Sequence, residues 1–273
     1  MTVTAIIAGQ GALPPYLAAA LQAQGMPYVT AELDGFAADL PGESPIRFRL
    51  ERLAPFLDQL ADQGVSRVVF GGAIRRPRLE PELIDPRTAT LLPRLMTGMA
   101  GGDDAALRAV ISIFEEWSFQ VIGADAVAPE LVPGPGVLAG DPSEADRRDA
   151  ARAAEIVAGL GTFDIGQGAV VAQGLCLAVE TLPGTDAMLD FVARHGDLRP
   201  DTKGAKGVLY KAPKPGQDRR IDLPMLGPAT LEAVSAAGLA GIAWEAGGAL
   251  LLDRAAMIEA AGRAGIFLWA REP

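Results

Sequence analysis

The sequence contains very few of the side chains on which the common nucleophilic hydrolases depend. Among its 273 residues there is one cysteine, Cys176, and one histidine, His195. A single cysteine excludes an internal disulfide and a zinc site built from cysteines, and its apolar surroundings predict a small core residue. A single histidine at the end of a predicted helix argues against a Ser-His-Asp or Cys-His catalytic site.

The sequence also lacks a long apolar run and a positive net charge. The best candidate for a membrane span, 238–252, is interrupted by Glu245 and falls short of the ~18 uncharged apolar residues that a span requires. No basic leader precedes the first apolar run, so we expect no signal peptide and a cytoplasmic location. The net charge of −10 argues against nucleic-acid binding as the main role.

The first half of the chain alternates between predicted strands and predicted helices. Helical spacing of apolar residues follows three of the strands, at 13–24, 53–60 and 107–114. Repeated strand–helix units predict an α/β domain, 1–132, with a parallel sheet and helices on both faces. The predicted strands are 3–9, 27–33, 46–50, 66–72 and 119–123.

A segment rich in proline and glycine, 133–142, is predicted to be a linker without regular structure. The predicted second domain, 143–273, begins with a helix at 143–160 that Ser143 caps. Two strands are predicted within 168–180, joined by a tight turn at Gln173-Gly174. Further predictions are a helix at 185–196 capped by Thr185, paired strands at 241–246 and 249–252, and helices from Pro228 or Ala229 to 237 and at 254–264.

Three glycine-rich motifs of the first half are candidate ligand sites. Gly9-Gln10-Gly11 resembles a nucleotide-binding turn, but Pro14 occupies the place of the third glycine in the dinucleotide motif, and a purely structural turn is the alternative. Arg75 and Arg76 follow a predicted strand, where they suit bidentate contact with a pyrophosphate or form an exposed basic loop. Asp103 begins a predicted helix as a cap, or contacts a metal or a substrate hydroxyl.

The second half holds the densest group of acids, amides and lysines. Each acid alone is equally explained as a helix cap or a surface charge. Together, oxygen ligands without histidine suit Mg²⁺ or Mn²⁺, which polarises phosphoryl oxygens and activates water, while a lysine nearby offsets developing negative charge. The group predicts a metal-assisted phosphoryl site and comprises Asp164, Gln167, Glu180, Thr185, Asp186, Lys211, Lys214, Gln217, Asp218 and Asp222.

These motifs together resemble the UDP-2,3-diacylglucosamine pyrophosphatase family of Gram-negative lipid A synthesis, in the metal-dependent group unrelated to the calcineurin-like enzyme. The resemblance covers essentially the whole chain. It implies an N-terminal Rossmann-like domain, a family-specific α/β catalytic domain, and a homodimer. The blocks that carry it are 6–14, 71–79, 101–110, 164–174, 178–189, 206–230 and 237–247.

The resemblance implies hydrolysis of UDP-2,3-diacylglucosamine to UMP and 2,3-diacylglucosamine 1-phosphate with Mg²⁺, and an essential role for Asp222. Our hypothesis is that Asp222 and Asp186 hold the metal, with Mn²⁺ as an alternative ion, and position or deprotonate water. Lys211 and Lys214 would offset charge on the pyrophosphate. The substrate-binding predictions are Gln10, Gly11, Ala73, Arg75, Arg76, Asp103, Gln167, Thr185, Gln217 and Asp218.

Two other functions are consistent with parts of the sequence. The turn at Gly9-Gln10-Gly11, with Glu32 as a ribose-binding acid, would suit an NAD(P)-dependent oxidoreductase. A non-catalytic protein that binds a nucleotide sugar or a lipid is the other alternative.

Since the expected substrate carries two acyl chains, the resemblance also implies an apolar groove and peripheral contact with the inner membrane.

Overall fold

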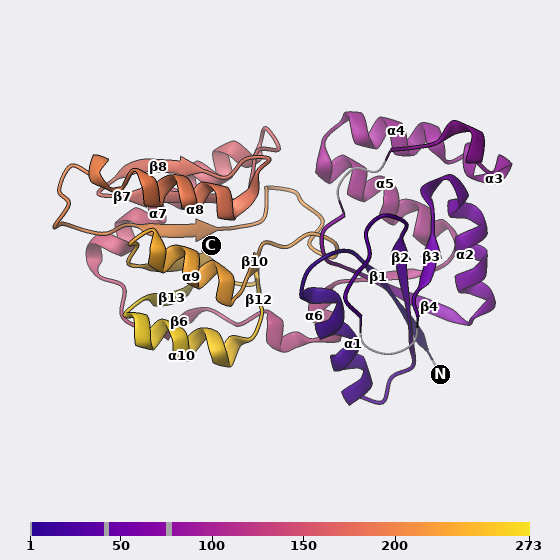
Figure 1. Ribbon diagram of the computed structural model, residues 1–273, viewed down its shortest axis with the longest axis horizontal. Coiled ribbons are helices and arrows are strands. Elements are labelled where there is room, and N and C mark those ends of the chain that lie inside the picture. The colour runs from indigo at the N-terminus through magenta and orange to yellow at the C-terminus, as the bar shows by residue number, and fades with distance from the viewer. Residues whose placement is uncertain (1, 41–43, 75–77) are drawn as a thin grey trace. The chain divides into compact units, whose positions relative to one another are not determined.

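The computed structural model describes residues 2–40, 44–74 and 78–273, which divide into two compact units, one ending at Pro129 and the other spanning Glu130–Pro273 (Figure 1). The first unit is built on a five-stranded sheet in the order β3-β2-β1-β4-β5, with every pair parallel. This confirms the parallel sheet predicted from the sequence. Its strands are β1 (Val3–Ala8), β2 (Tyr28–Leu33), β3 (Ile46–Phe48), β4 (Val65–Gly71) and β5 (Gln120–Ile122).

The longer helices of the first unit each bury apolar residues on one face. Leu17 and Leu21 of α1 (Leu13–Ala23) and Phe114 of α5 (Asp103–Glu116) are among its most deeply buried side chains. The helix α4, which packs on α5, was not predicted from the sequence. The other helices are α2 (Leu53–Asp62), α3 (Pro86–Ala89), α4 (Leu92–Ala100) and α6 (Ala124–Val127), with short 3-10 turns at Leu50–Arg52 and Pro81–Leu83. A further 3-10 turn, Pro129–Leu131, spans the boundary between the two units.

The second unit is built on a six-stranded mixed sheet in the order β6-β13-β11-β9-β7-β8. The central strands β9, β11 and β13 run parallel, whereas β7 is antiparallel to both β8 and β9. A separate pair, β10 (Met225–Leu226) with β12 (Leu250–Leu251), is also parallel. The six strands are β6 (Gly136–Ala139), β7 (Gly168–Ala172), β8 (Leu175–Val179), β9 (Val208–Lys211), β11 (Gly241–Glu245) and β13 (Phe267–Arg271).

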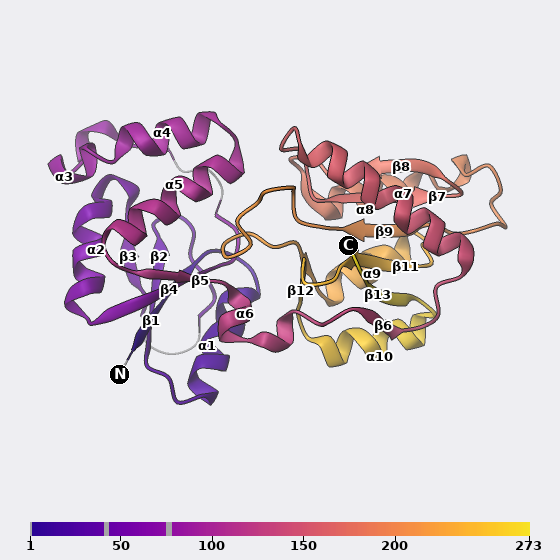
Figure 2. The ribbon, with the colours of Figure 1, turned by 180° about the vertical axis from the view of Figure 1, so that it is seen from behind.

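Helices cover both faces of this sheet (Figure 2). Alternate strand residues point to opposite faces, so Val170 and Leu209 pack with α8 (Gly184–Arg194), α9 (Pro228–Ala236) and α10 (Arg254–Ala264). Their neighbours in the strands, such as Val171 and Val208, pack on the other face with α7 (Glu144–Gly161). The predicted helices at 143–160 and 254–264 are confirmed, and Ser143 forms the predicted cap of α7.

The turn between β7 and β8 is the one predicted from the sequence. Gln173 and Gly174 both have positive φ, at 55° and 78°, as a tight turn between antiparallel strands requires. The buried carboxylate of Asp149 accepts the backbone N–H groups of both turn residues, at 2.9 and 2.8 Å. This hydrogen bonding fixes the hairpin against α7.

Four local predictions are wrong. Part of the predicted linker, Gly136–Ala139, forms β6 and pairs antiparallel with β13. Leu250–Leu251 pairs with β10 rather than with the strand at 241–245. Thr185 lies inside α8, whose N-cap is Pro183, and its hydroxyl bonds to Glu180 instead of capping the helix. Cys176 is exposed because β8 is an edge strand with one side open to solvent.

Candidate functional site

The two glycine-rich turns of the first unit bond to each other. The backbone N–H of Gln10 donates to the carbonyl of Ala73 at 2.9 Å, and the N–H of Ala73 donates to the carbonyl of Gln10 at 2.8 Å. A Cβ atom at Gly9 or Gly72 would lie 2.7 Å from the backbone of the opposite turn. The glycines are therefore required for close packing, and the N–H groups of Gln10 and Ala73 are already bonded rather than directed at a phosphate.

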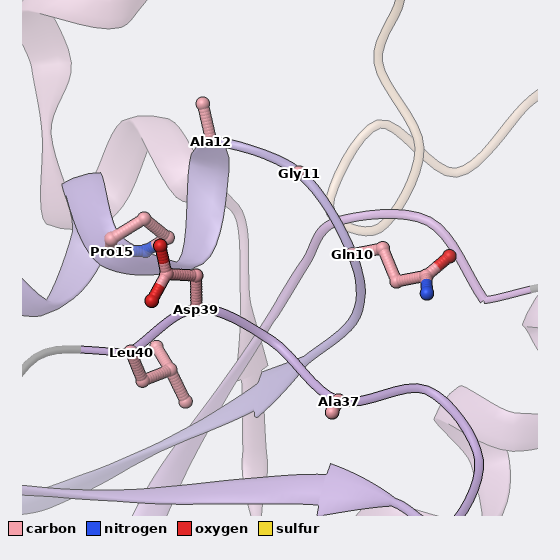
Figure 3. A pocket seen from close by; sticks show the side chains of 7 residues that line it. All are labelled: Gln10, Gly11, Ala12, Pro15, Ala37, Asp39 and Leu40. Atoms are coloured by element: carbon pink, nitrogen blue, oxygen red, sulfur yellow. The ribbon is translucent and has the colours of Figure 1, made fainter.

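An open pocket of about 720 Å³ lies beside this turn (Figure 3). Its lining includes Gln10 and Gly11 but, among the residues that the structure describes, no lysine or arginine, and Asp39 adds a negative charge. Pro14 and Pro15 in the first turn of α1 have no backbone N–H to offer an anion. The pocket therefore suits a hydroxylated or amide-bearing group better than a phosphate.

The remaining predicted ligands of the first unit are dispersed. Arg75 and Arg76 lie outside the described residues. Asp103 is exposed at the start of α5, after Gly102 at φ 109°. The carboxylate of Glu32 accepts hydrogen bonds from Arg47 at 3.0 Å and from the N–H of Ala38 at 3.3 Å. These bonds occupy both oxygens of Glu32, which weakens the argument for a ribose contact in a nicotinamide enzyme.

The second unit brings Asp222 together with the two predicted amides. Oδ2 of Asp222 accepts a hydrogen bond from Gln167 Nε2 at 3.0 Å and a short one from Gln217 Nε2. Gln217 Oε1 in turn accepts from Gln167 Nε2 at 3.0 Å and from the backbone N–H of Lys214 at 2.8 Å. The loop after β9 and the turn before β7 thus meet at one carboxylate, in an arrangement that fixes its orientation.

Burial raises the pKa of Asp222 above the ordinary value of an aspartate. The positive charge of Lys214, the bonds from Gln167 and Gln217, and the charge of Lys211 oppose this shift but do not cancel it. A raised pKa makes an ionised carboxylate a stronger proton acceptor, and perturbed acids of this kind are concentrated at functional sites. The shift supports a chemical role for Asp222.

Lys214 is held beside Asp222 by an ion pair. Its Nζ lies 2.5 Å from Asp164 Oδ1, and its side chain is 10% exposed. Asp164 itself has positive φ, at 58°, in the turn that follows α7. Lys214 therefore has a fixed position, close enough to Asp222 for its positive charge to act on that carboxylate.

Lys211 is the second lysine of the site and is almost fully buried at the end of β9. Its Nζ donates to Thr185 Oγ1 at 2.6 Å and lies 3.4 Å from Glu180. The Thr185 hydroxyl donates to Glu180 Oε1 at 2.7 Å. The predicted residues Lys211 and Thr185 are therefore in contact. Glu180, which the sequence placed in the same predicted group without a separate role, connects them.

Two of the predicted acids, Asp186 and Asp218, have other surroundings than Asp222. Asp186 is exposed in the first turn of α8, and its side chain makes no hydrogen bond or ion pair with another described residue. The carboxylate of Asp218 forms an ion pair with Arg220 at 2.7 Å. The structure thus joins Gln167, Gln217, Lys214 and Asp222 in one network.

A divalent metal fits this site in one arrangement only. Across residues 2–40, 44–74 and 78–273, no three histidine, cysteine, aspartate or glutamate side chains are grouped closely enough to hold a metal ion. Magnesium commonly takes one or two protein carboxylates and completes its shell with water and substrate phosphates. Asp222 as a protein ligand fits that mode, whereas a cage made only of protein groups does not.

A parallel α/β unit, followed by a mixed-sheet unit with a partly buried acid, two amides and two lysines, defines a two-unit α/β protein with a site suited to phosphoryl chemistry. Residues 3–131 match the LpxI N-terminal domain and residues 134–269 match the LpxI C-terminal domain. The sequence is 39% identical over 271 residues to the UDP-2,3-diacylglucosamine pyrophosphatase LpxI of Caulobacter vibrioides. The aligned region covers 98% of this chain and 97% of that protein. The chain belongs to the LpxI family.

Proposed function

We propose that the protein hydrolyses the pyrophosphate bond of UDP-2,3-diacylglucosamine, releasing UMP and 2,3-diacylglucosamine 1-phosphate for lipid A biosynthesis. The observation that carries the proposal is the 39% identity to the Caulobacter pyrophosphatase over nearly the full length of both chains. The cluster around Asp222 supplies the chemistry that this reaction needs. An acid with a raised pKa lies beside two fixed lysines.

In the proposed reaction a water molecule attacks one phosphorus and the bond from that phosphorus to the bridging oxygen breaks. Asp222 orients the water and accepts its proton, since its carboxylate is held by two amides and its pKa is raised. Lys211 and Lys214 offset the negative charge that develops on the phosphoryl oxygens and the leaving group. Gln167 and Gln217 act mainly on Asp222, rather than on substrate as the sequence suggested.

We further propose that Mg²⁺ takes part, with Asp222 as a protein ligand and Mn²⁺ as an alternative ion. The bound ion would polarise a phosphoryl oxygen and lower the pKa of water. We propose Asp186, which is exposed in the first turn of α8, as the second protein ligand.

The test is incubation of the wild-type protein with UDP-2,3-diacylglucosamine and Mg²⁺, followed by chromatography for UMP. We expect UMP release by the wild type, and a rate about 10²- to 10⁴-fold lower for Asp222→Asn. Binding of the nucleotide sugar without any UMP release would support the non-catalytic alternative. Equal rates for the two proteins would show that Asp222 is not part of the reaction.

We also propose that the protein acts on its lipid substrate at the cytoplasmic surface of the inner membrane, as a homodimer with a Rossmann-like first unit. In the part of the chain that the structure describes, no helix has the length and hydrophobicity of a membrane span. Large apolar side chains are nevertheless exposed in loops of the second unit, with Leu182 98% and Phe163 76% exposed. We propose that these side chains make the peripheral contact with acyl chains, since exposed apolar surface can mark a site of membrane interaction.

Cosedimentation with lipid vesicles tests the membrane contact. The wild type is expected to bind them more strongly than the double variant Leu182→Ser, Phe163→Ser. Equal sedimentation of the two proteins would exclude this surface as the contact. Light scattering at several protein concentrations tests the homodimer, and the mass of a single chain would refute it.

A further inference from the structure

We propose that Glu180 is a positioning residue for the reaction. Its carboxylate fixes the ammonium of Lys211 and the hydroxyl of Thr185, and joins them to the turn that carries Gln167 to Asp222. The inference rests on the proposed function for its kinetic test. No part of the proposal requires Glu180 to touch the substrate.

The contacts of Glu180 reach both halves of the candidate site. Oε1 accepts the hydroxyl of Thr185 at 2.7 Å, and the ammonium of Lys211 lies 3.4 Å away. Oε2 accepts the backbone N–H of Gln167 at 3.3 Å. Because the side chain of Gln167 holds Asp222 at 3.0 Å, one carboxylate connects the lysine to the acid through a single intervening residue.

Burial and charge explain why a carboxylate is needed at this position. The side chains of Lys211 and Glu180 are only 5% and 13% exposed. A charged lysine at that depth is costly unless a partner of opposite charge lies beside it. Among the described residues, Glu180 is the one acid that forms an ion pair with Lys211, so loss of its charge would leave the ammonium without a counter-charge in direct contact.

The chain around Glu180 is shaped to hold it. Gly166 has φ 53°, and a Cβ atom there would lie 2.0 Å from the carbonyl oxygen of Glu180. A Cβ atom at Gly168 would lie 2.9 Å from Oε2 of the same residue. The backbone N–H of Glu180 also donates to the carbonyl of Gly168 at 2.8 Å. The two glycines on either side of Gln167 therefore let the turn pack directly on Glu180.

The donors of Lys211 show how this geometry serves the reaction. An ammonium group has three N–H donors. Thr185 and Glu180 take two of them, which leaves one for a phosphoryl oxygen. Because the Thr185 hydroxyl gives its hydrogen to Glu180, it receives the lysine N–H with a lone pair. Glu180 thereby determines the direction in which Lys211 can donate.

The kinetic test compares Glu180→Gln and Glu180→Asp with the wild type, and with Glu232→Gln, which changes an exposed glutamate on α9. For Glu180→Gln we expect kcat to fall about 10- to 100-fold, as a misplaced catalytic group would cause, while KM changes less than about threefold. Glu180→Asp, which keeps the charge, should recover part of kcat. Glu232→Gln should match the wild type. A kcat for Glu180→Gln within twofold of the wild type would overturn the proposal.

A second measurement does not depend on activity. Acylation of lysines by an amine-reactive reagent, followed residue by residue by mass spectrometry, reports how firmly Lys211 is held as a charged ion. We expect Lys211 to react several-fold faster in Glu180→Gln than in the wild type, with exposed Lys203 unchanged. Unchanged reactivity of Lys211 in the folded variant would refute the ion pair.

The two readouts separate the inference from the function on which it rests. If the wild type releases no UMP, the proposed function fails while the acylation test still decides whether Glu180 holds Lys211. If Glu180→Gln does not fold, Glu180→Asp decides the question, because a carboxylate drawn back by one methylene must still lower kcat. Wild-type kinetics in a folded Glu180→Asp variant would overturn the positioning role in that case.

Discussion

Replacing Asp222 by asparagine should stabilise the protein while it removes catalysis. Asparagine has nearly the same shape as aspartate, and its one oxygen can still accept the N–H groups of Gln167 and Gln217. What the substitution removes is the negative charge. Burial raises the pKa of that carboxyl in the folded protein, which means that folding disfavours the ionised form.

The sign of the pH dependence follows from this direction. When an acid has a higher pKa folded than unfolded, the folded state binds more protons between the two pKa values. Stability from this group therefore falls as pH rises through that interval. At neutral pH the wild type carries the full cost of the buried charge and the asparagine variant does not. The free energy of unfolding should rise by about 0.5–2 kcal/mol, which is typical when a strained active-site group is neutralised.

Thermal unfolding followed by circular dichroism between pH 4 and 8 measures this effect. A gain of 1 kcal/mol corresponds to roughly 2–4 °C in Tm for a unit of this size. The difference between Asp222→Asn and the wild type should be small at pH 4 and grow toward neutral pH, while UMP release falls. The exposed Asp197→Asn serves as the control and should change Tm little at either pH. A variant that melts below the wild type at pH 7, or a difference that shrinks as pH rises, would refute the reasoning.

Three further predictions concern the turn before β7, the start of α7 and the metal. Gly166→Ala should lower the free energy of unfolding by about 2–4 kcal/mol in chemical denaturation, since its Cβ would lie 2.0 Å from the carbonyl oxygen of Glu180. The control Gly159→Ala, in α7 with open space around it, should be neutral or stabilising by up to ~1 kcal/mol. Equal effects of the two substitutions would contradict the packing argument. Ser143→Ala removes a cap of α7 and should lower the free energy of unfolding by about 1 kcal/mol in the same assay, with kcat within twofold of the wild type. A large loss of kcat would show that α7 also shapes the site. Chelation by EDTA should stop UMP release, and added Mg²⁺ should restore it. Asp186→Asn should raise the Mg²⁺ concentration needed for the half-maximal rate. Full activity in EDTA would rule out the metal.

Local patterns predicted most of the elements correctly. The five strands of the first unit are rich in β-branched and apolar residues, and each forms where its pattern indicates. Ser143 before a charged helical stretch, and Gln173-Gly174 between two apolar runs, specify their structures through contacts only a few residues away. Such features are predictable because the interactions that decide them lie within one turn or one hairpin.

Features that depend on distant partners were missed. The segment Gly136–Ala139 forms a strand only because β13, more than a hundred residues later, offers an edge for pairing. Leu250–Leu251 pairs with β10 rather than with β11, the strand that precedes it in sequence, because β11 already pairs with β9 and β13 on its two sides. Cys176 is exposed since β8 ends the sheet, and neither the order of strands nor their edges can be read from the apolar pattern of one strand.

The candidate site shows the same difference between features that local sequence determines and features that depend on distant partners. The sequence by itself determined the parallel sheet of the first unit, the family to which the chain belongs, and the chemical types present around Asp222. Only the tertiary structure decided which of those groups meet, because the ends of β8 and β9 and the turn before β7 come together through sheet pairing. That pairing brought Glu180 to Lys211 and Gln167 to Asp222, and left Asp186 exposed. Residue types follow from the sequence alone, whereas their contacts depend on the sheet order that packing selects.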